Sequence, residues 1–276
     1  MLSRLVLFAL VLTACAPAIT STPLPALTRE PTWTIAPTQT STTPPTSTVA
    51  PTETLTPAPA IQVCSPLADY SLGQIPGLVT NPYHPPPPGS DNPHEGVDLS
   101  VLQPGTRVAL AGAPVQAALA GTVAAAIQDR FPYGNALIIE TPLDGLPADW
   151  PGLAVLPTPA PTLPFNGPLT CPDVDLHLAL DPQQRSLYLV YAHLQAAPTL
   201  QAGDRVACAQ PLGKIGASGN ALNPHLHLEA RVGPSGARFA SLAHYDPGAS
   251  PAEMATYCAW RVSNAFQLVD PLLIVK

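Results

Sequence analysis

Proline is the feature that most limits what this chain can fold into, because it fixes φ and removes a backbone hydrogen-bond donor. The 276 residues include 38 prolines, which are concentrated in a few segments. Ten lie in residues 16–60, nine lie in residues 142–172, and a run of four, Pro85–Pro88, follows His84. A folded unit is therefore expected over residues 61–276, interrupted by a proline-rich insertion or long surface loop at about 142–172.

The first 14 residues are typical of an export signal. Arg4 precedes an apolar run, Leu5–Leu12, that is far shorter than the about 20 residues needed to span a bilayer. Cys15 follows Leu12-Thr13-Ala14, and this tetrapeptide resembles the lipobox of bacterial lipoproteins. The resemblance implies cleavage before Cys15 and its lipidation. An ordinary signal peptide with a chance cysteine, or an uncleaved anchor, is the alternative. We expect an extracytoplasmic chain, lipid-anchored to the cell envelope membrane.

The segment after Cys15 has the composition of a disordered tether. Of residues 16–60, 27 are Thr, Ser or Pro and only three are charged. Such a segment contains too few large apolar residues to offset the entropy of ordering it. Residues 15–60 are thus predicted to be a lipidated cysteine and a linker that carries the folded unit.

The charge balance argues against nucleic acid as a partner. The chain has 11 Lys and Arg residues against 18 Asp and Glu residues, a net charge of −7. Surfaces that follow a phosphate backbone require clustered cations. We expect no nucleic-acid binding, and the sequence leaves the oligomeric state open.

Four cysteines remain besides Cys15: Cys64, Cys171, Cys208 and Cys258. An even number in an exported chain predicts disulfide bonds. No two of them have the CxxC spacing of a zinc site, so structural bridges are favoured over metal binding. Three pairings are possible, and the sequence does not choose among them.

The folded unit is predicted to be mainly β, an antiparallel sheet or sandwich-like domain. Short alternating runs bounded by Gly or Pro indicate strands, and convincing long amphipathic helices are absent from the pattern. The expected strands are Gly96–Ser100, Arg107–Leu110, Pro114–Ala118, Thr122–Gln128, Asn135–Glu140, Leu187–Leu194, Arg205–Ala207 and His225–Val232.

Four of the seven histidines fall in three short motifs, which are HEGVD at 94–98, YAHL at 191–194 and HLHLE at 225–229. Residues i and i+2 of a strand share a face, so His225 and His227 should project together. The same alternation predicts that Tyr191 and His193 share a face. An isolated histidine on a strand is usually a structural or surface residue, but four in three motifs favour a common site.

His94 and Asp98 would lie roughly 13 Å apart in a straight strand, so they can share one ion only if the chain bends, which Gly96 would permit. The fragment resembles the helical HExxH zinc motif with Glu95 as base. That interpretation is rejected, because the second histidine is missing and the glycine disfavours a helix. Two histidines and one aspartate, with a position left for water, match the usual composition of a catalytic zinc site.

The ordered motifs HxxxD, YAHL and HxH resemble those of the lysostaphin/LytM-type zinc metallopeptidases, which cleave peptidoglycan. The resemblance covers about residues 83–232 apart from the insertion. It implies one zinc ion per chain held by His94, Asp98 and His227, with His193 and His225 as catalytic histidines. It also implies a zinc-dependent endopeptidase that hydrolyses peptide bonds in bacterial peptidoglycan. Supporting matches are Gly112–Ala117, Gly121–Val123, Tyr133–Asn135 and Gly213–Asn220.

Two departures from the family pattern leave the substrate preference open: Val101–Ala111 is longer than usual, and the insertion precedes the YAHL motif. The alternatives in function are a non-catalytic domain of the same fold that binds the wall or activates an amidase, and a metal-binding lipoprotein. Glu229 is either a partner of a histidine or a solvated or salt-bridged surface carboxylate. The remaining histidines, which are expected to lie outside the site, are His84, His177 and His244.

Overall fold

The computed structural model describes residues 62–87, 90–145, 169–173 and 181–275. The predicted signal, lipidated cysteine and tether, most of the predicted insertion, and His177 lie outside these residues. The strands are β1 (Val79–Asn81), β2 (Gly96–Leu99), β3 (Pro114–Gln116), β4 (Gly121–Arg130), β5 (Gly134–Pro142), β6 (Asp181–Ala192), β7 (Arg205–Val206), β8 (Pro211–Lys214), β9 (Leu226–Ser235) and β10 (Gln267–Val269). The helices are α1 (Pro251–Arg261) and the 3-10 helices η1 (Leu72–Leu78), η2 (Leu143–Gly145) and η4 (Pro271–Leu273).

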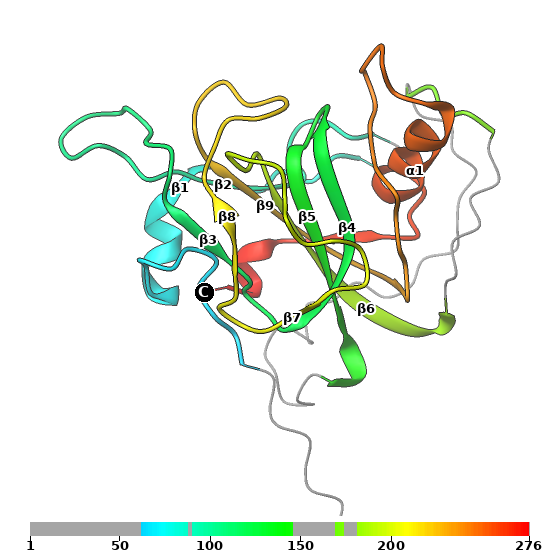
Figure 1. Ribbon diagram of the computed structural model, residues 1–276, viewed down its shortest axis with the longest axis horizontal. Helices are drawn as coiled ribbons and strands as arrows, with labels where there is room; N and C mark the ends of the chain where they lie inside the picture. Colours follow the sequence, from blue (N-terminus) through cyan, green and yellow to red (C-terminus); the bar gives the residue numbers. More distant parts are fainter. Residues whose placement is uncertain (1–61, 88–89, 146–168, 174–180, 276) are drawn as a thin grey trace, which may run out of the picture. The chain divides into compact units, whose positions relative to one another are not determined.

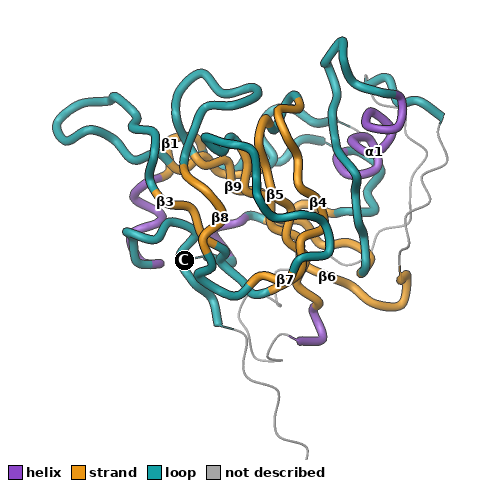
Figure 2. Tube along the Cα trace, viewed as in Figure 1, coloured by secondary structure: helices purple, strands orange, loops and turns teal. Residues whose placement is uncertain are grey.

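Within the described residues, an eight-stranded sheet forms the framework (Figure 1). Its strand order is β1-β2-β9-β6-β5-β4-β7, and β10 pairs with β9 beside this path. β3 and β8 form a separate two-stranded sheet. Every pairing of these strands is antiparallel, and strands make up most of the regular structure (Figure 2). The prediction of a mainly β, antiparallel fold is confirmed.

The main sheet is buried on both faces, as the alternation along its central strands shows. One face carries a first apolar cluster, to which β6 and β9 contribute Leu187, Leu189, Tyr191, Leu226, Leu228, Ala230 and Val232. The opposite face carries a second cluster, to which β6 contributes the intervening residues Tyr188, Val190 and Ala192. The corresponding residues of β9 are His227, Glu229 and Arg231, all buried. Polar groups therefore gather on the second face of β9, where β6 carries apolar ones.

One helix, α1, was not expected from the sequence pattern. Ser250 caps it, Pro251 occupies its first turn, and Glu253 completes a capping box with Ser250, which together are a recognisable start signal. The helix packs Tyr257 and Trp260 into the second apolar cluster. No helix in the described part of the chain has the length and apolar character needed to cross a membrane.

Both disulfide bonds join segments that are far apart in the sequence. Cys64 is bonded to Cys208, and Cys171, near the end of the insertion, is bonded to Cys258 of α1. This is one of the three pairings that the sequence allows. The second bond holds the part of the chain just before β6 against the C-terminal helix.

The predicted strands agree with the structure except at a few places. The strand expected at Arg107–Leu110 is wrong, because this segment has only the isolated bridge Leu102–Ala109. β1, β8 and β10 were not expected. The predicted strands also overrun the histidines, since β6 ends before His193 and β9 begins after His225.

Candidate metal centre

The centre is built on the pairing of β2 with β9. Asp98 lies directly opposite His227 in this antiparallel pair, and the Asp98 Oδ1 to His227 Nδ1 distance is 3.0 Å. A slip by one residue would exchange the two faces of β9, and burying a leucine is worth about 1.5–3 kcal/mol. The apolar alternation of β9 therefore fixes the register in which Asp98 meets His227.

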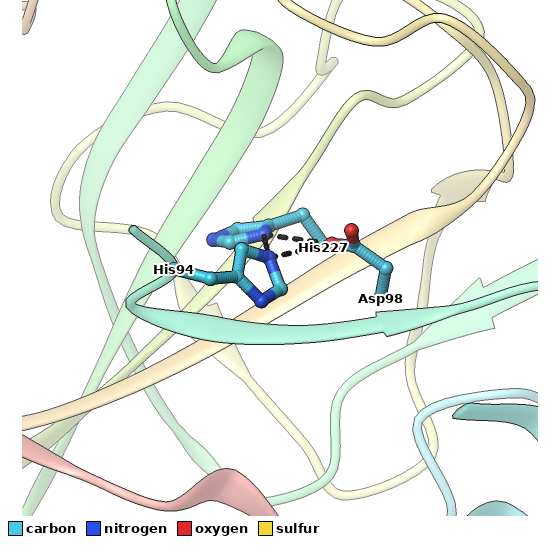
Figure 3. A group of neighbouring side chains, drawn as sticks. All are labelled: His94, Asp98 and His227. Carbon is cyan, nitrogen blue, oxygen red and sulfur yellow. Dashed lines mark hydrogen bonds and ion pairs between the residues drawn. The ribbon is translucent and has the colours of Figure 1, made fainter. Parts of the chain in front are cut away.

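His94 reaches the same point from the segment before β2. Its backbone N–H and C=O pair with those of His84, and its Nε2 lies 3.1 Å from Asp98 Oδ1 and 3.3 Å from His227 Nδ1. Figure 3 shows the three side chains turned toward one another. The Nδ1 of His94 is 2.8 Å from the Pro82 carbonyl, which can only accept, so Nδ1 carries a proton. Nε2 is therefore the ring nitrogen that is turned toward Asp98 and His227.

Gly96 has a role other than the bend that the sequence suggests. It is the first residue of β2, and a Cβ there would lie 2.4 Å from the Leu228 carbonyl oxygen and 2.9 Å from Cε1 and Nε2 of His227. Any side chain at this position would displace the imidazole or the neighbouring strand. The glycine thus provides the room in which the His227 ring lies across β2.

His193 and His225 adjoin these three residues. The His193 ring centroid is 4.7 Å from that of His225 and 5.8 Å from that of His227, and His225 Nε2 lies 3.4 Å from Asp98 Oδ1. His193 Nδ1 donates to the Ser218 carbonyl at 2.7 Å and His225 Nδ1 to the Asn223 carbonyl at 2.8 Å. Each ring is therefore fixed with its Nε2 free.

The prediction that His193 shares a face with Tyr191 is wrong. Tyr191 packs in the first apolar cluster, and its hydroxyl accepts a hydrogen bond from the Ala118 N–H. His193 follows the last residue of β6 and has φ 62°, a left-handed conformation that a non-glycine residue seldom adopts. This turn of the backbone carries its imidazole to the second face, beside His227.

The surroundings set the charge of these groups. Burial, together with the nearby His227 and His225, lowers the pKa of His193 to about 3, so this imidazole is neutral. Burial opposes ionisation of Asp98, but hydrogen bonds from His227 and His94 hold its pKa well below the usual range. Burial also opposes the charged form of His227, yet its bonds to Asp98 and Glu229 raise its pKa to about 9.

Glu229 is a buried partner of His227, and the alternative of a surface carboxylate is wrong. The side chain is fully buried, and its Oε2 lies 3.5 Å from His227 Nε2 and accepts a hydrogen bond from the Tyr133 hydroxyl at 2.8 Å. Arg231 Nε donates to its other oxygen at 2.5 Å. Tyr133 and Arg231 were missed, although the period-two spacing of 227, 229 and 231 places the arginine on the same face.

Arg231 also contacts a second buried acid, Glu95. Arg231 Nη2 donates to Glu95 Oε2 at 2.5 Å, and Arg261 of α1 forms an ion pair with the same carboxylate. Glu95 is 1% exposed, and burial raises its pKa. Residues 96–99 form a strand rather than a helix, which agrees with rejecting the HExxH interpretation. We call Glu95, Glu229, Arg231 and Arg261 the charge network.

The five clustered side chains open onto a groove. A cavity of about 740 Å³ is lined by His94, Asp98, His193, His225 and His227, together with residues of several loops. Two other histidines do not line it. His84 is exposed and touches His94 through its backbone, and the His244 ring bonds the Thr170 carbonyl, in agreement with the prediction that they lie outside.

The geometry suits a divalent ion. One ligand atom each from His94, Asp98 and His227 lies within 4.8 Å of the others, and their pairwise separations are 3.0 to 3.3 Å. Ligands bound tetrahedrally to zinc at about 2.0–2.1 Å are about 3.3 Å apart. Two imidazole nitrogens and one carboxylate oxygen are donors that zinc accepts, so these residues fit the ion.

No curated protein matches this chain. Solved structures that resemble it include a mutant catalytic domain of the prophage-encoded M23 protein EnpA from Enterococcus faecalis, at 20% identity and TM-score 0.33 over 59% of this chain and 87% of that one. The catalytic domain of the antimicrobial peptidase lysostaphin from Staphylococcus simulans has 20% identity and TM-score 0.35, over 59% and 86%. A zinc-containing peptidase from Vibrio cholerae has 20% identity and TM-score 0.34, over 66% and 40%.

A family model gives a match over one part of the chain. The matched segment contains His193, His225 and His227, whereas His94 and Asp98 precede it. Three of the five clustered side chains therefore come from residues 177–239, the segment that matches the model of Peptidase family M23.

Proposed function

We propose that the chain is a zinc-dependent endopeptidase that hydrolyses peptide bonds in bacterial peptidoglycan. The observation that carries the proposal is the convergence of His94, Asp98 and His227 at one point of a groove, with two further imidazoles beside them. The match of residues 177–239 to a peptidase family supports the class of reaction.

The ion would be held by Nε2 of His94, Oδ1 of Asp98 and Nδ1 of His227, the atoms that approach one another. When bound, zinc supplies Lewis-acid polarisation of a carbonyl and makes water nucleophilic near neutral pH. Asp98 contributes the negative charge of the site. Glu229 orients the His227 ring from its other nitrogen, as partners of metal-binding histidines commonly do.

His193 and His225 would handle protons. Each has its Nδ1 bonded to a backbone carbonyl, so each can accept or return a proton only at Nε2. His193 is neutral because of its lowered pKa, and it can therefore accept a hydrogen bond from water or from the leaving amine. Both rings line the groove. Once a ring has taken up a proton, it would also stabilise negative charge on the oxygen of the scissile carbonyl.

We further propose that the chain works at the cell envelope. A lipidated Cys15 would hold it to the membrane, and the tether of residues 16–60 would let the folded unit reach peptidoglycan at a distance. The lipobox-like sequence and the composition of the tether support this placement.

The proposal is tested with protein that begins at residue 16. We expect about one zinc ion per chain and the release of new amino termini from isolated peptidoglycan. His227→Ala should lose zinc and lower the rate more than about 10³-fold, whereas His193→Ala should keep zinc and lose about 10²–10⁴-fold. The matched control is His84→Ala, because the His84 side chain is exposed and its contact with His94 is through the backbone.

Zinc-loaded wild-type protein that binds peptidoglycan but releases no amino termini would contradict the proposal. That result would favour the non-catalytic alternative, a domain that binds the wall or activates an amidase.

A further inference from the structure

The segment between β2 and β3 forms a small hairpin, residues 101–110 (Figure 1). Leu110 N–H donates to the Val101 carbonyl and Gln103 N–H to the Val108 carbonyl, both at 2.8 Å. Its tip is a turn closed by Thr106 N–H on the Gln103 carbonyl at 3.0 Å. This is the extra length that distinguishes Val101–Ala111 in the sequence.

The tip of the 101–110 hairpin is shaped by its sequence. Pro104 occupies the second position of the turn, and Gly105 occupies the third with φ 72°, which is the arrangement of a type II turn. The Thr106 hydroxyl adds a bond to the Gln103 carbonyl at 2.9 Å. A preformed hairpin loses little conformational entropy when a ligand binds against it.

One face of this hairpin forms a wall of the groove. Leu102, Arg107 and Ala109 line the cavity, and they follow the period of two expected for a hairpin in which Leu102 pairs with Ala109. Val108 and Leu110, which alternate with them, are exposed but do not line the cavity. Arg107 therefore belongs to the face that a bound substrate would meet.

Arg107 differs from the other arginine of the groove wall. Arg261 also lines the cavity, but Glu95 neutralises it. Arg107 is exposed, and within the described residues no acidic side chain pairs with its guanidinium. The other acids that line the groove are engaged, since Asp91 accepts from Tyr245 and Tyr257 and Asp98 faces the histidines. A guanidinium presents a planar fork of donors that matches a carboxylate.

We infer that Arg107 forms a carboxylate-binding subsite of the groove, which selects peptides that carry a free carboxylate away from the cleaved bond. The inference rests on the proposed function for the identity of the substrate, a peptidoglycan stem peptide. The same peptide with that carboxylate converted to a carboxamide would lose the charge and bind less well. The hairpin thus gives the groove a preference for substrates that are not amidated.

The test compares two synthetic stem peptides that differ only in one carboxylate or carboxamide. Wild-type protein should favour the carboxylate about tenfold in kcat/KM, through KM. R107Q should remove the preference, and R107K, which keeps the charge but not the fork, should give an intermediate ratio. R205Q removes the same charge from exposed Arg205 of β7, outside the groove, and should keep the wild-type ratio. An unchanged ratio in R107Q would overturn the inference.

Equilibrium binding of the two peptides to the metal-free wild-type protein separates this inference from the proposed function. Suppose that the zinc-loaded protein cleaves neither peptide, but the metal-free protein still binds the carboxylate peptide about tenfold tighter than the carboxamide peptide. If R107Q also abolishes that difference in binding, the subsite stands and the endopeptidase proposal fails. Equal binding of both peptides to the wild type overturns the subsite, whatever the cleavage result. The binding preference should also shrink as salt rises, because an exposed ion pair is screened.

Discussion

Two clusters of ionisable side chains lie next to each other, and both include residues from the same face of β9. The metal cluster, His94, Asp98 and His227, lies at the groove, where these side chains are 10 to 14% exposed. The charge network lies next to the metal cluster. In the pairing of β2 with β9, Asp98 is opposite His227, and two residues further along Gly96 is opposite Glu229 of the network. In the network the side chains of Glu95, Glu229 and Arg231 are at most 2% exposed.

The two clusters differ in how their charges are matched. In the network each carboxylate has a guanidinium partner, and Arg231 also donates to the carbonyls of Trp260 and Phe266 at 2.9 Å. Hydrogen bonds of this kind offset the cost of removing the charges from water, although Glu95 Oε1 and Arg261 Nε are buried without a hydrogen-bond partner among the described residues. In the metal cluster, nitrogens of His94 and His227 approach a single oxygen of Asp98, and Nε2 of the adjoining His225 approaches the same oxygen. The network pairs its charges with one another and supports the fold, whereas the metal cluster brings two ring nitrogens and one carboxylate oxygen to one point, where they can bind an ion.

Arg231→Met should give the largest effect, and it should fall on stability. It would leave two buried carboxylates without their main partner, so the free energy of unfolding should drop by about 3–5 kcal/mol. Urea denaturation of the metal-free protein measures this. The control Arg205→Met, at an exposed position, should change it by less than about 0.5 kcal/mol. A loss below 1 kcal/mol in Arg231→Met would show that the network does not support the fold.

Glu229→Gln tests the contact between the two clusters. The amide keeps the size of the side chain but loses the charge that faces His227 Nε2, so the histidine is less firmly oriented. Zinc affinity should fall about 10–100-fold, measured by competition with a chelating dye. The control Glu253→Gln removes a carboxylate from the start of α1 and should leave zinc affinity unchanged. Equal affinities in both variants would show that the metal cluster is independent of the network.

The sequence predicts the parts of this arrangement that depend on local period. The alternation of Leu226 and Leu228 with His227 and Glu229 is visible in the sequence, and it places the polar residues on one face. The three histidine motifs, through their resemblance to a peptidase family, indicated the five side chains that the structure brings together. The capping box of Ser250 and Glu253 is also present in the sequence, although no helix was predicted there.

Other features depend on contacts that no local pattern contains. The direction of His193 follows from its left-handed backbone, which the YAHL motif does not reveal. The need for glycine at position 96 arises from the ring of His227 on the neighbouring strand. Arg261, which follows Glu95 by more than 160 residues, completes the network from α1. Both disulfide pairings likewise required the folded chain.

Tyr133→Phe should give the smallest effect on stability, and it tests how the charge network influences zinc binding by the metal cluster. The Tyr133 hydroxyl donates to Glu229 and accepts from Trp260 Nε1 at 3.1 Å, so its removal should lower the free energy of unfolding by about 1 kcal/mol. The ring would remain under the Arg261 guanidinium. Tyr70→Phe, at a partly buried tyrosine that packs against the first apolar cluster, is the control for loss of a hydroxyl.

Zinc affinity in Tyr133→Phe should fall less than in Glu229→Gln, because the hydroxyl acts on His227 only through the carboxylate. Combined in one protein, the two substitutions should therefore weaken zinc binding no more than Glu229→Gln alone. Such non-additivity is the signature of residues that act through one another. If the two effects on zinc affinity add instead, Tyr133 reaches the metal cluster by another route, through the groove that it also lines.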